Sequence, residues 1–191
     1  MSVYVQYPDD WIGVPEFGEG EVFATPAEWA RALVDELIPL ADENLEEGER
    51  VALIGALTLA GTGVADRGAN TSYVRLRTLR GPLELVDLVL VPRSAVGDAP
   101  AEEVAGSLDP DAINPPTVTE LSTAAGLRGA LVVWHAPLDA EAPHIVTLRA
   151  AAALDVGNGF AVLGTSTTDL AQFEVFRPDF MALIESVTVD A

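Results

Sequence analysis

The stretch HIVTLRAAAALDVGNGFAVLGT, residues 144–165, decides the fold class of this 191-residue chain. Its first part, His144 to Asp155, alternates side chains of different polarity, as a β-strand with two unlike faces does. The following Gly157-Asn158-Gly159 is a turn sequence whose residues tolerate positive φ. Phe160–Thr165 then supplies a return strand. The stretch therefore predicts a long antiparallel β-hairpin.

The neighbouring segments extend this hairpin into a sheet with a helix. Gly129–Ala136 is a strong strand candidate and Thr117–Ser122 a further one. Residues 166–169 offer a helix N-cap, and we expect Pro178 to begin a second helical segment because proline suits a first helical position. Residues 186–189 alternate again and predict a short last strand.

The first 50 residues predict one strand and one helix. Alternation over 3–7 indicates a strand, and Trp11 follows in a stretch punctuated by proline and glycine. Thr25 and Glu28 form a capping box around Pro26, which marks a helix start. An apolar stripe at helical spacing follows (Trp29, Leu33, Leu37 and Leu40), and we expect Pro39 to kink or end the helix.

The next segments predict an antiparallel meander. Residues 50–59 are rich in Val, Leu and Ile and favour a strand, and residues 61–71 favour a turn. Residues 72–80 alternate in a way that favours a half-buried strand with its arginines on the wet face. Residues 83–91 complete the meander and end at Pro92.

Residues 93–116 interrupt the regular pattern. This segment is rich in Pro, Gly and acidic residues, yet it keeps the apolar side chains of Val104, Leu108 and Ile113. We therefore expect a surface excursion that packs back on the domain, with one helical turn near residues 101–105. Residues 1–191 are expected to form a single α+β domain, an antiparallel β-sheet flanked by helices in an α/β/α sandwich.

Composition limits the function classes. All ten basic residues are arginines, and 30 acidic residues bring the net charge to −20. Such a chain repels phosphate backbones and anionic membrane surfaces, so we expect neither nucleic acid nor membrane as a partner. The absence of Cys excludes disulfides and thiolate catalysis. This composition favours a high-GC bacterial source, with a salt-adapted organism as the alternative.

The expected cellular location depends on two features that the sequence does not show, a signal peptide and a membrane helix. The segment Met1–Asp10 has no basic region and no apolar core of signal-peptide length. The longest apolar stretches, Val51–Ala60 and Leu83–Val91, fall short of the ~20 residues that a membrane helix needs. We therefore expect a cytoplasmic protein.

No catalytic motif stands out, so we expect no catalytic residue, no cofactor and no metal. His135, Asp139, Glu141 and His144 could in principle form a loop metal site, but their spacing matches no compact metal motif. The favoured interpretation is a hairpin loop with solvated acids.

Five residues are candidates for partner binding. Trp11 is the best candidate for an exposed anchor, although packing in the interior is the favoured interpretation of this side chain. Arg75 and Arg77 share one face of the expected strand; surface ion pairs are the favoured interpretation, and docking of an acidic partner or a carboxylate ligand is the functional alternative. Phe173 and Phe176 could line a groove between helix and sheet.

The last third of the chain resembles a known superfamily. The strand ending in Trp134, the hairpin from His144 and the ending with Phe180, Ile184 and Ser186 are similar to the PsbP-like superfamily. That superfamily includes Mog-type Ran-binding proteins and bacterial DcrB-like proteins. The resemblance covers about residues 131–189. It implies an antiparallel sheet with a helix on each side and a mostly non-catalytic, accessory role.

The resulting expectation is a non-enzymatic partner-binding protein. It would act as an adaptor or chaperone in a bacterial assembly or secretion pathway. Its partner would be another protein with a basic surface, because the acidic chain attracts one. A small-molecule-binding protein or enzyme with a pocket between sheet and helices is the second hypothesis. A structural subunit of a homo-oligomer, such as a homodimer, is the third.

Overall fold

The computed structural model describes residues 2–8, 10–41, 44–139 and 142–190. The chain divides into two compact units, which are described separately. Unit 1 comprises Met1–Pro8 and Val86–Ala191, and unit 2 comprises Asp9–Leu85. The expectation of a single domain stays a prediction.

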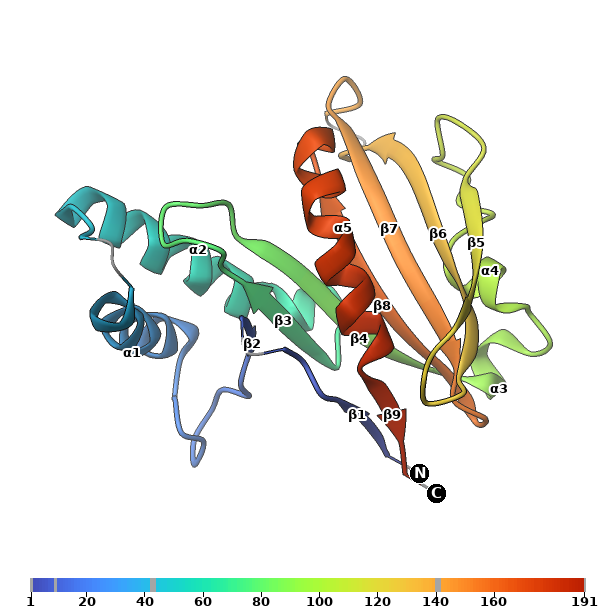
Figure 1. Ribbon diagram of the computed structural model, residues 1–191, viewed down its shortest axis with the longest axis horizontal. Helices are drawn as coiled ribbons and strands as arrows, with labels where there is room; N and C mark the ends of the chain where they lie inside the picture. Colours follow the sequence, from blue (N-terminus) through green and yellow to red (C-terminus); the bar gives the residue numbers. More distant parts are fainter. Residues whose placement is uncertain (1, 9, 42–43, 140–141, 191) are drawn as a thin grey trace. The chain divides into compact units, whose positions relative to one another are not determined.

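Unit 1 is built on an antiparallel sheet with the strand order β4-β8-β7-β6-β5 (Figure 1). The strands are β4 (Glu84–Pro92, of which Val86 onward belongs to unit 1), β5 (Thr117–Ser122), β6 (Arg128–Pro137), β7 (Val146–Asp155) and β8 (Gly159–Thr167). The predicted hairpin is confirmed, with Asp155 opposite Phe160 at its closed end. The predicted strands before and after it are confirmed as well.

Helix α5 (Leu170–Glu185) crosses one face of this sheet (Figure 1). The Asp169 carboxylate accepts from the backbone N–H of Gln172 at 3.0 Å, which confirms the predicted N-cap. The predicted break at Pro178 is wrong, because the helix runs through it. Proline removes only one backbone N–H from the helix. Aromatic packing spans the position, with the stacked rings of Phe176 and Phe180 5.8 Å apart.

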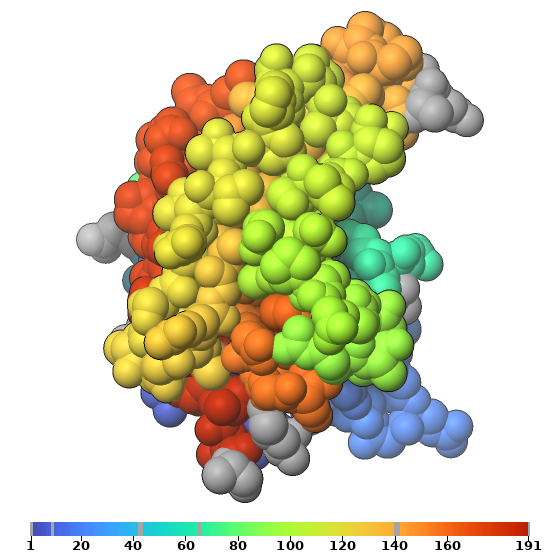
Figure 2. Space-filling view, turned by 90° about the vertical axis from the view of Figure 1, so that its right-hand side faces the viewer, coloured from blue at the N-terminus to red at the C-terminus, as the bar shows by residue number. Residues whose placement is uncertain are grey.

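The excursion, residues 93–116, covers the opposite face, where it appears in green in Figure 2. It contains the short helices α3 (Arg93–Val96) and α4 (Ala101–Val104), the latter at the predicted position. Asp109 accepts from the Trp134 indole N–H at 2.8 Å, and Ile113 N–H donates to the His135 carbonyl at 2.8 Å. The excursion thus packs back on the sheet, as predicted.

Two short strands lie outside this sheet in unit 1. β1 (Val3–Val5) pairs antiparallel with β9 (Val187–Val189), which places Val3 opposite Val189. Both strands were expected from alternation alone. The α+β class with an antiparallel sheet is therefore confirmed.

Unit 2 packs two helices on a strand pair. Its elements are β2 (Trp11–Gly13), α1 (Pro26–Leu37), the 3₁₀ turn η1 (Ile38–Leu40), α2 (Glu47–Asp66) and β3 (Thr71–Arg75). The predicted capping box is present, since the Thr25 hydroxyl accepts from Glu28 N–H at 3.2 Å and Glu28 accepts from Ala24 N–H at 3.0 Å. Pro39 follows the end of α1, as predicted.

Helix α2 corrects the largest error of the sequence analysis. The predicted strand over residues 50–59 and the predicted turn over 61–71 are wrong. The antiparallel meander, which needed that strand, is therefore wrong as well. A short apolar run fits a buried helix as well as a strand. Leu53, Leu57 and Ala60 follow helical spacing and are buried in the core of unit 2. None of the helices among the described residues is long and apolar enough to cross a membrane.

The strand predicted over residues 72–80 is also shorter than expected. β3 ends at Arg75, and the chain then turns. Arg75 is buried at 7% exposure, so the predicted wet face for this side chain is wrong. The arginine can be buried because two carboxylates, Asp10 and Glu84, lie against its guanidinium.

Candidate functional site

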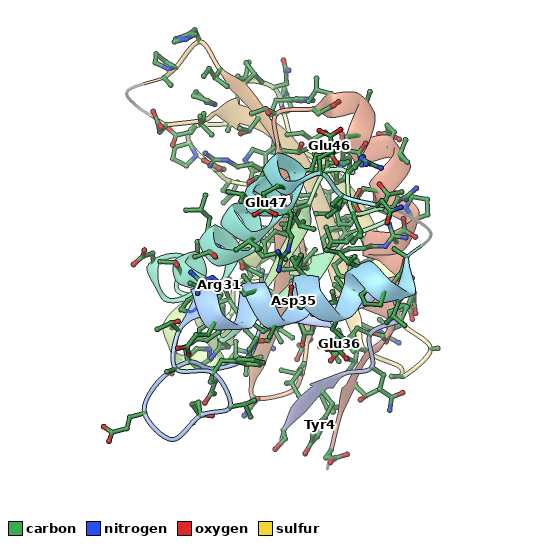
Figure 3. The ribbon with its side chains drawn as sticks, turned by 90° about the vertical axis from the view of Figure 1, so that its left-hand side faces the viewer. Tyr4, Arg31, Asp35, Glu36, Glu46 and Glu47 are labelled. Carbon is green, nitrogen blue, oxygen red and sulfur yellow. The ribbon has the colours of Figure 1, made fainter. Side chains whose placement is uncertain are left out.

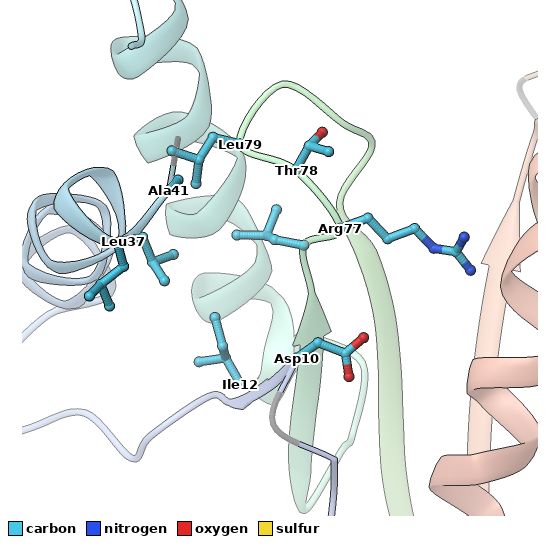
Figure 4. Close-up of a pocket in the computed structure, with 9 residues that line it drawn as sticks. Asp10, Ile12, Leu37, Ala41, Arg77, Thr78 and Leu79 are labelled. Atoms are coloured by element: carbon cyan, nitrogen blue, oxygen red, sulfur yellow. The ribbon is translucent and has the colours of Figure 1, made fainter. Parts of the chain in front are cut away.

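An apolar hollow opens on the surface of unit 2 where α1 ends (Figure 4). Its volume is about 230 Å³. We call it the η1 hollow and define it by the residues that line it: Asp10, Ile12, Leu37, Leu40, Ala41, Leu76, Arg77, Thr78 and Leu79. Six of these nine side chains are apolar, so the hollow presents mainly hydrocarbon to solvent.

The local sequence explains why the hollow forms. Pro39 lacks a backbone N–H, and the α-helix ends at Leu37 in favour of the tighter η1 turn. The turn moves Leu40 off the buried face of α1, and this side chain is 79% exposed. Leu40 was the last residue of the apolar stripe predicted from the sequence, and the break at Pro39 separates it from the helical part of that stripe. Leu40 thus adds to the apolar lining of the hollow, and contiguous exposed apolar surface is the kind of feature that marks interaction sites.

Charged and polar side chains stand around the apolar floor. Asp10 lies at one edge, whereas the guanidinium of Arg77 points away from the leucines (Figure 4). Asp10 is exposed but accepts from Arg75 Nε at 2.7 Å. The same guanidinium lies 3.2 Å from Glu84. Two carboxylates therefore share the Arg75 guanidinium beside the hollow.

A second hollow, of about 310 Å³, lies beside α2. We call it the α2 hollow; it is lined by Glu49, Ala52, Leu53, Ala56, Leu79, Arg80, Gly81 and Leu83. Leu79 lines both hollows. Arg80 donates to the two Glu49 carboxylate oxygens at 2.7 and 2.9 Å. That hydrogen bond, with a second from the Glu46 backbone N–H, holds the pKa of Glu49 below its usual value of 4.5.

Acidic side chains gather on the helical side of unit 2. Asp35 and Glu36 on α1 and Glu46 and Glu47 at the start of α2 are all exposed, with Arg31 among them (Figure 3). Acidic side chains at the first turn of α2 are stabilised there by the positive end of the helix dipole. This surface and the η1 hollow belong to the same unit.

A third hollow, of about 580 Å³, lies in unit 1. It is lined by Ser2, Val3, Leu90, Val91, Pro92, Val156, Asn158, Gly159 and Phe160. None of these side chains is titratable. Arg93 lies over the Phe160 ring at 4.3 Å and pairs with Asp155 at 2.6 Å. The hollow thus offers apolar contact without a group suited to acid–base chemistry.

The structure separates the five predicted binding residues. Trp11, Phe173 and Phe176 are buried at 3%, 1% and 4% exposure, so the favoured packing interpretation of Trp11 is confirmed and the exposed anchor is wrong. Arg75 is buried in its ion cluster, and it does not share an exposed face with Arg77. Only Arg77 is exposed, and it lines the η1 hollow. Partner binding by these residues stays a prediction.

The two histidines lie at different depths. His135 is half-buried on β6, and His144 is exposed in the turn before β7. Glu141 lies outside the described residues. Among the residues that are described, no group of three or more His, Cys, Asp or Glu side chains could hold a metal ion. The η1 hollow was not predicted from the sequence, although Pro39 before Leu40 was a signal that this leucine leaves the helix stripe.

Comparisons with known proteins do not establish a family. No family model matches the chain, and no curated protein matches it. Among solved structures, it is similar to cyanobacterial PsbP (CyanoP) from Synechocystis, with a TM-score of 0.42 and 13% identity over 99% of this chain and 92% of that chain. This is the PsbP-type structure that the sequence resemblance named. A likeness at this level carries no functional argument, and the Mog-type and DcrB-like relations stay predictions.

Proposed function

We propose that this chain is a non-enzymatic protein that binds another protein through the η1 hollow. The observation that carries the proposal is Leu40, which is 79% exposed at the edge of a hollow lined by leucine, isoleucine and alanine. In this proposal, an apolar side chain of the partner enters the hollow and Leu40 closes over it. Removing apolar surface from water supplies the main driving force.

The size of the η1 hollow favours a side chain over a metabolite. Pockets for small molecules usually measure about 300–1,000 Å³ and hold convergent polar groups. The η1 hollow measures about 230 Å³, and its floor is hydrocarbon. One anchor side chain from a partner suits that volume, because protein interfaces concentrate their binding energy in a few apolar anchors.

The charge of the chain defines the partner. The net charge is −20, and the exposed acids Asp35, Glu36 and Asp10 belong to the same unit as the hollow. Such a field attracts a basic surface and raises the rate of encounter. The proposed partner therefore carries an apolar anchor flanked by Lys or Arg. An adaptor or chaperone role in a bacterial assembly or secretion pathway, in the cytoplasm, belongs to this proposal.

The proposal is tested with two variants of equal charge. Leu40→Glu places a carboxylate at the hollow, whereas Val22→Glu changes a side chain of unit 2 that is 87% exposed and does not line the hollow. Both proteins and the unchanged chain are used to capture proteins from extract of the source organism, with quantitative mass spectrometry. We expect one dominant partner that Leu40→Glu loses and Val22→Glu keeps.

Salt dependence tests the role of charge in the proposed docking, and the comparison of the two variants tests its specificity. Binding to a basic partner weakens as salt rises, because exposed charges are screened over about 8 Å at physiological ionic strength. Equal capture by both glutamate variants would contradict the proposal. So would a copurifying metabolite in place of any protein.

A further inference from the structure

The outer face of α2 is apolar and uncharged. The sequence has no charged residue between Arg50 and Asp66. Val51 and Leu59 are 60% and 73% exposed on this face, and Ala52, Gly55 and Ala56 between them are exposed as well. A surface helix normally turns charged side chains to water. This helix instead exposes a hydrocarbon face in a chain that carries 30 acidic residues.

Gly55 lies in the middle of this face. Among the described residues, none lies within 4 Å of a Cβ atom built at Gly55. At Gly61 on the same helix, a Cβ atom would lie 3.0 Å from Pro26 and 3.2 Å from the Phe17 ring. Glycine inside a helix is less stable than alanine. Close approach of Pro26 and Phe17 therefore explains Gly61, whereas Gly55 leaves open space into which a neighbour outside the chain would fit.

The spacing of the exposed residues is self-complementary. Val51, Gly55 and Leu59 lie four residues apart and form one ridge along the helix. If two copies of α2 cross antiparallel at Gly55, Leu59 of each copy lies opposite Val51 of the other. A two-fold interface has this property, because each contact occurs twice. The small residue at the axis lets the two helices approach closely.

The charges at the two ends of the face favour the antiparallel arrangement. Glu47 is exposed one turn before Val51 and lies 3.9 Å from Arg50. At the other end, the Arg67 guanidinium folds back over Gly63 and donates to the Ala60 carbonyl at 3.2 Å and the Ser72 hydroxyl at 3.3 Å. In the antiparallel register Glu47 of one copy lies across Gly63 of the other, one turn from Arg67. A parallel pair would instead bring the acids Glu47 and Glu49 of both copies together. Antiparallel helix dipoles also attract.

We propose that the outer face of α2 is a dimer interface, in which the Val51-Gly55-Leu59 ridge packs antiparallel against the same ridge of a second copy of this chain. The second copy covers the apolar face, and Glu47 and Arg67 form ion pairs at its two ends. This surface is separate from Leu40, so the dimer and the proposed partner binding can fail independently.

Sedimentation velocity over a range of protein concentrations tests the proposal on the full chain. As the protein concentration rises, we expect the sedimenting species to change from a monomer of 20.1 kDa to a dimer of twice that mass. Gly55→Leu fills space that is open within the chain, so the fold is kept while the dissociation constant rises at least tenfold. Leu59→Glu should do the same, and Val22→Glu should change nothing. A chain that stays monomeric, or a dimer unaffected by Gly55→Leu, would overturn the proposal.

A charge exchange tests the register. Glu47→Arg and Arg67→Glu each place like charges at both ends of the dimer, so each variant alone should dimerise more weakly. An equimolar mixture of the two restores both ion pairs and should dimerise as heterodimers. If the mixture associates no better than either variant alone, the antiparallel register is wrong. Circular dichroism of each variant confirms that α2 is folded before it is compared.

Discussion

The guanidinium of Arg75 and the carboxylate of Glu84 lie 3.2 Å apart, and their side chains are only 8% and 6% exposed. Asp10 takes the other side of the same guanidinium. A buried cation is tolerated when carboxylates pair with it. The ion cluster therefore ties β2, β3 and the residue that begins β4 into one arrangement, and it forms the polar edge of the η1 hollow.

Arg75→Met should destabilise unit 2 strongly. The substitution keeps the hydrocarbon stem and leaves the Glu84 carboxylate buried without its cation. Breaking a buried pair in this way costs about 3–5 kcal/mol. Urea unfolding followed by tryptophan fluorescence measures the loss, since Trp11 and Trp29 are buried in this unit. Arg31→Met on the exposed face of α1 is the control, with an expected change within about 0.5 kcal/mol. Equal stability of the two variants would show that the cluster is dispensable.

Replacing Gly61 or Gly55 of α2 by alanine should change the free energy of unfolding in opposite directions. Gly61→Ala brings a Cβ atom against Pro26 and the Phe17 ring, and such overpacking costs about 1–3 kcal/mol. Gly55→Ala meets nothing and should gain about 0.5–1 kcal/mol from helix propensity. Thermal unfolding at low protein concentration compares the pair. A loss of stability at Gly55 would mean that this face is covered within the chain.

The Glu49–Arg80 pair should contribute to stability in a defined pH range. The pKa of Glu49 is lowered in the folded chain, chiefly by the hydrogen bond from Arg80. A lowered folded-state pKa stabilises the fold above the unfolded value of 4.5, and the contribution is lost as pH falls through the folded-state pKa. Arg80→Gln should therefore narrow the stability difference between pH 7 and pH 3. If Arg80→Gln leaves the difference in unfolding free energy unchanged, protonation of Glu49 does not contribute to the loss of stability at low pH.

Asp109 should hold the excursion, residues 93–116, on the sheet of unit 1. It accepts from the Trp134 indole N–H at 2.8 Å and lies 3.4 Å from Arg149. Asp109→Ala leaves a largely buried indole N–H without this acceptor, which costs about 1–3 kcal/mol. Trp134 emission should shift to longer wavelength as water enters. Asp111→Ala removes an exposed neighbour and should leave emission unchanged. Identical spectra for both variants would argue against this anchor.

Local patterns predicted the parts of the fold that local chemistry determines. The hairpin of residues 144–165 combines alternation with a glycine turn, and the capping box at Thr25 and Glu28 involves four neighbouring residues. Helix α2 was missed because Val, Leu and Ile in a short run suit a strand as well as a buried helix. Only contacts with α1 and the strands of unit 2 distinguish a buried helix from a strand at this position.

The η1 hollow was harder to predict than the fold. Its lining comes from three segments distant in sequence, and no single motif contains them. Arg75 was expected in solvent because its partners Asp10 and Glu84 lie 65 and 9 residues away in the chain. The net charge of −20, by contrast, is visible directly in the sequence, and it carries the expectation of a basic partner.

The central claim is that a protein partner docks at the η1 hollow, and site-specific photo-crosslinking tests it most directly. A photoreactive phenylalanine analogue is placed at Leu40 in one protein and at Val22 in a second, both exposed positions of unit 2. After irradiation in cells of the source organism, crosslinked products are identified by mass spectrometry. The proposal predicts one protein joined at Leu40 through an apolar segment flanked by basic residues, and none of it at Val22. No protein adduct at Leu40, or the same adducts at both positions, would contradict it.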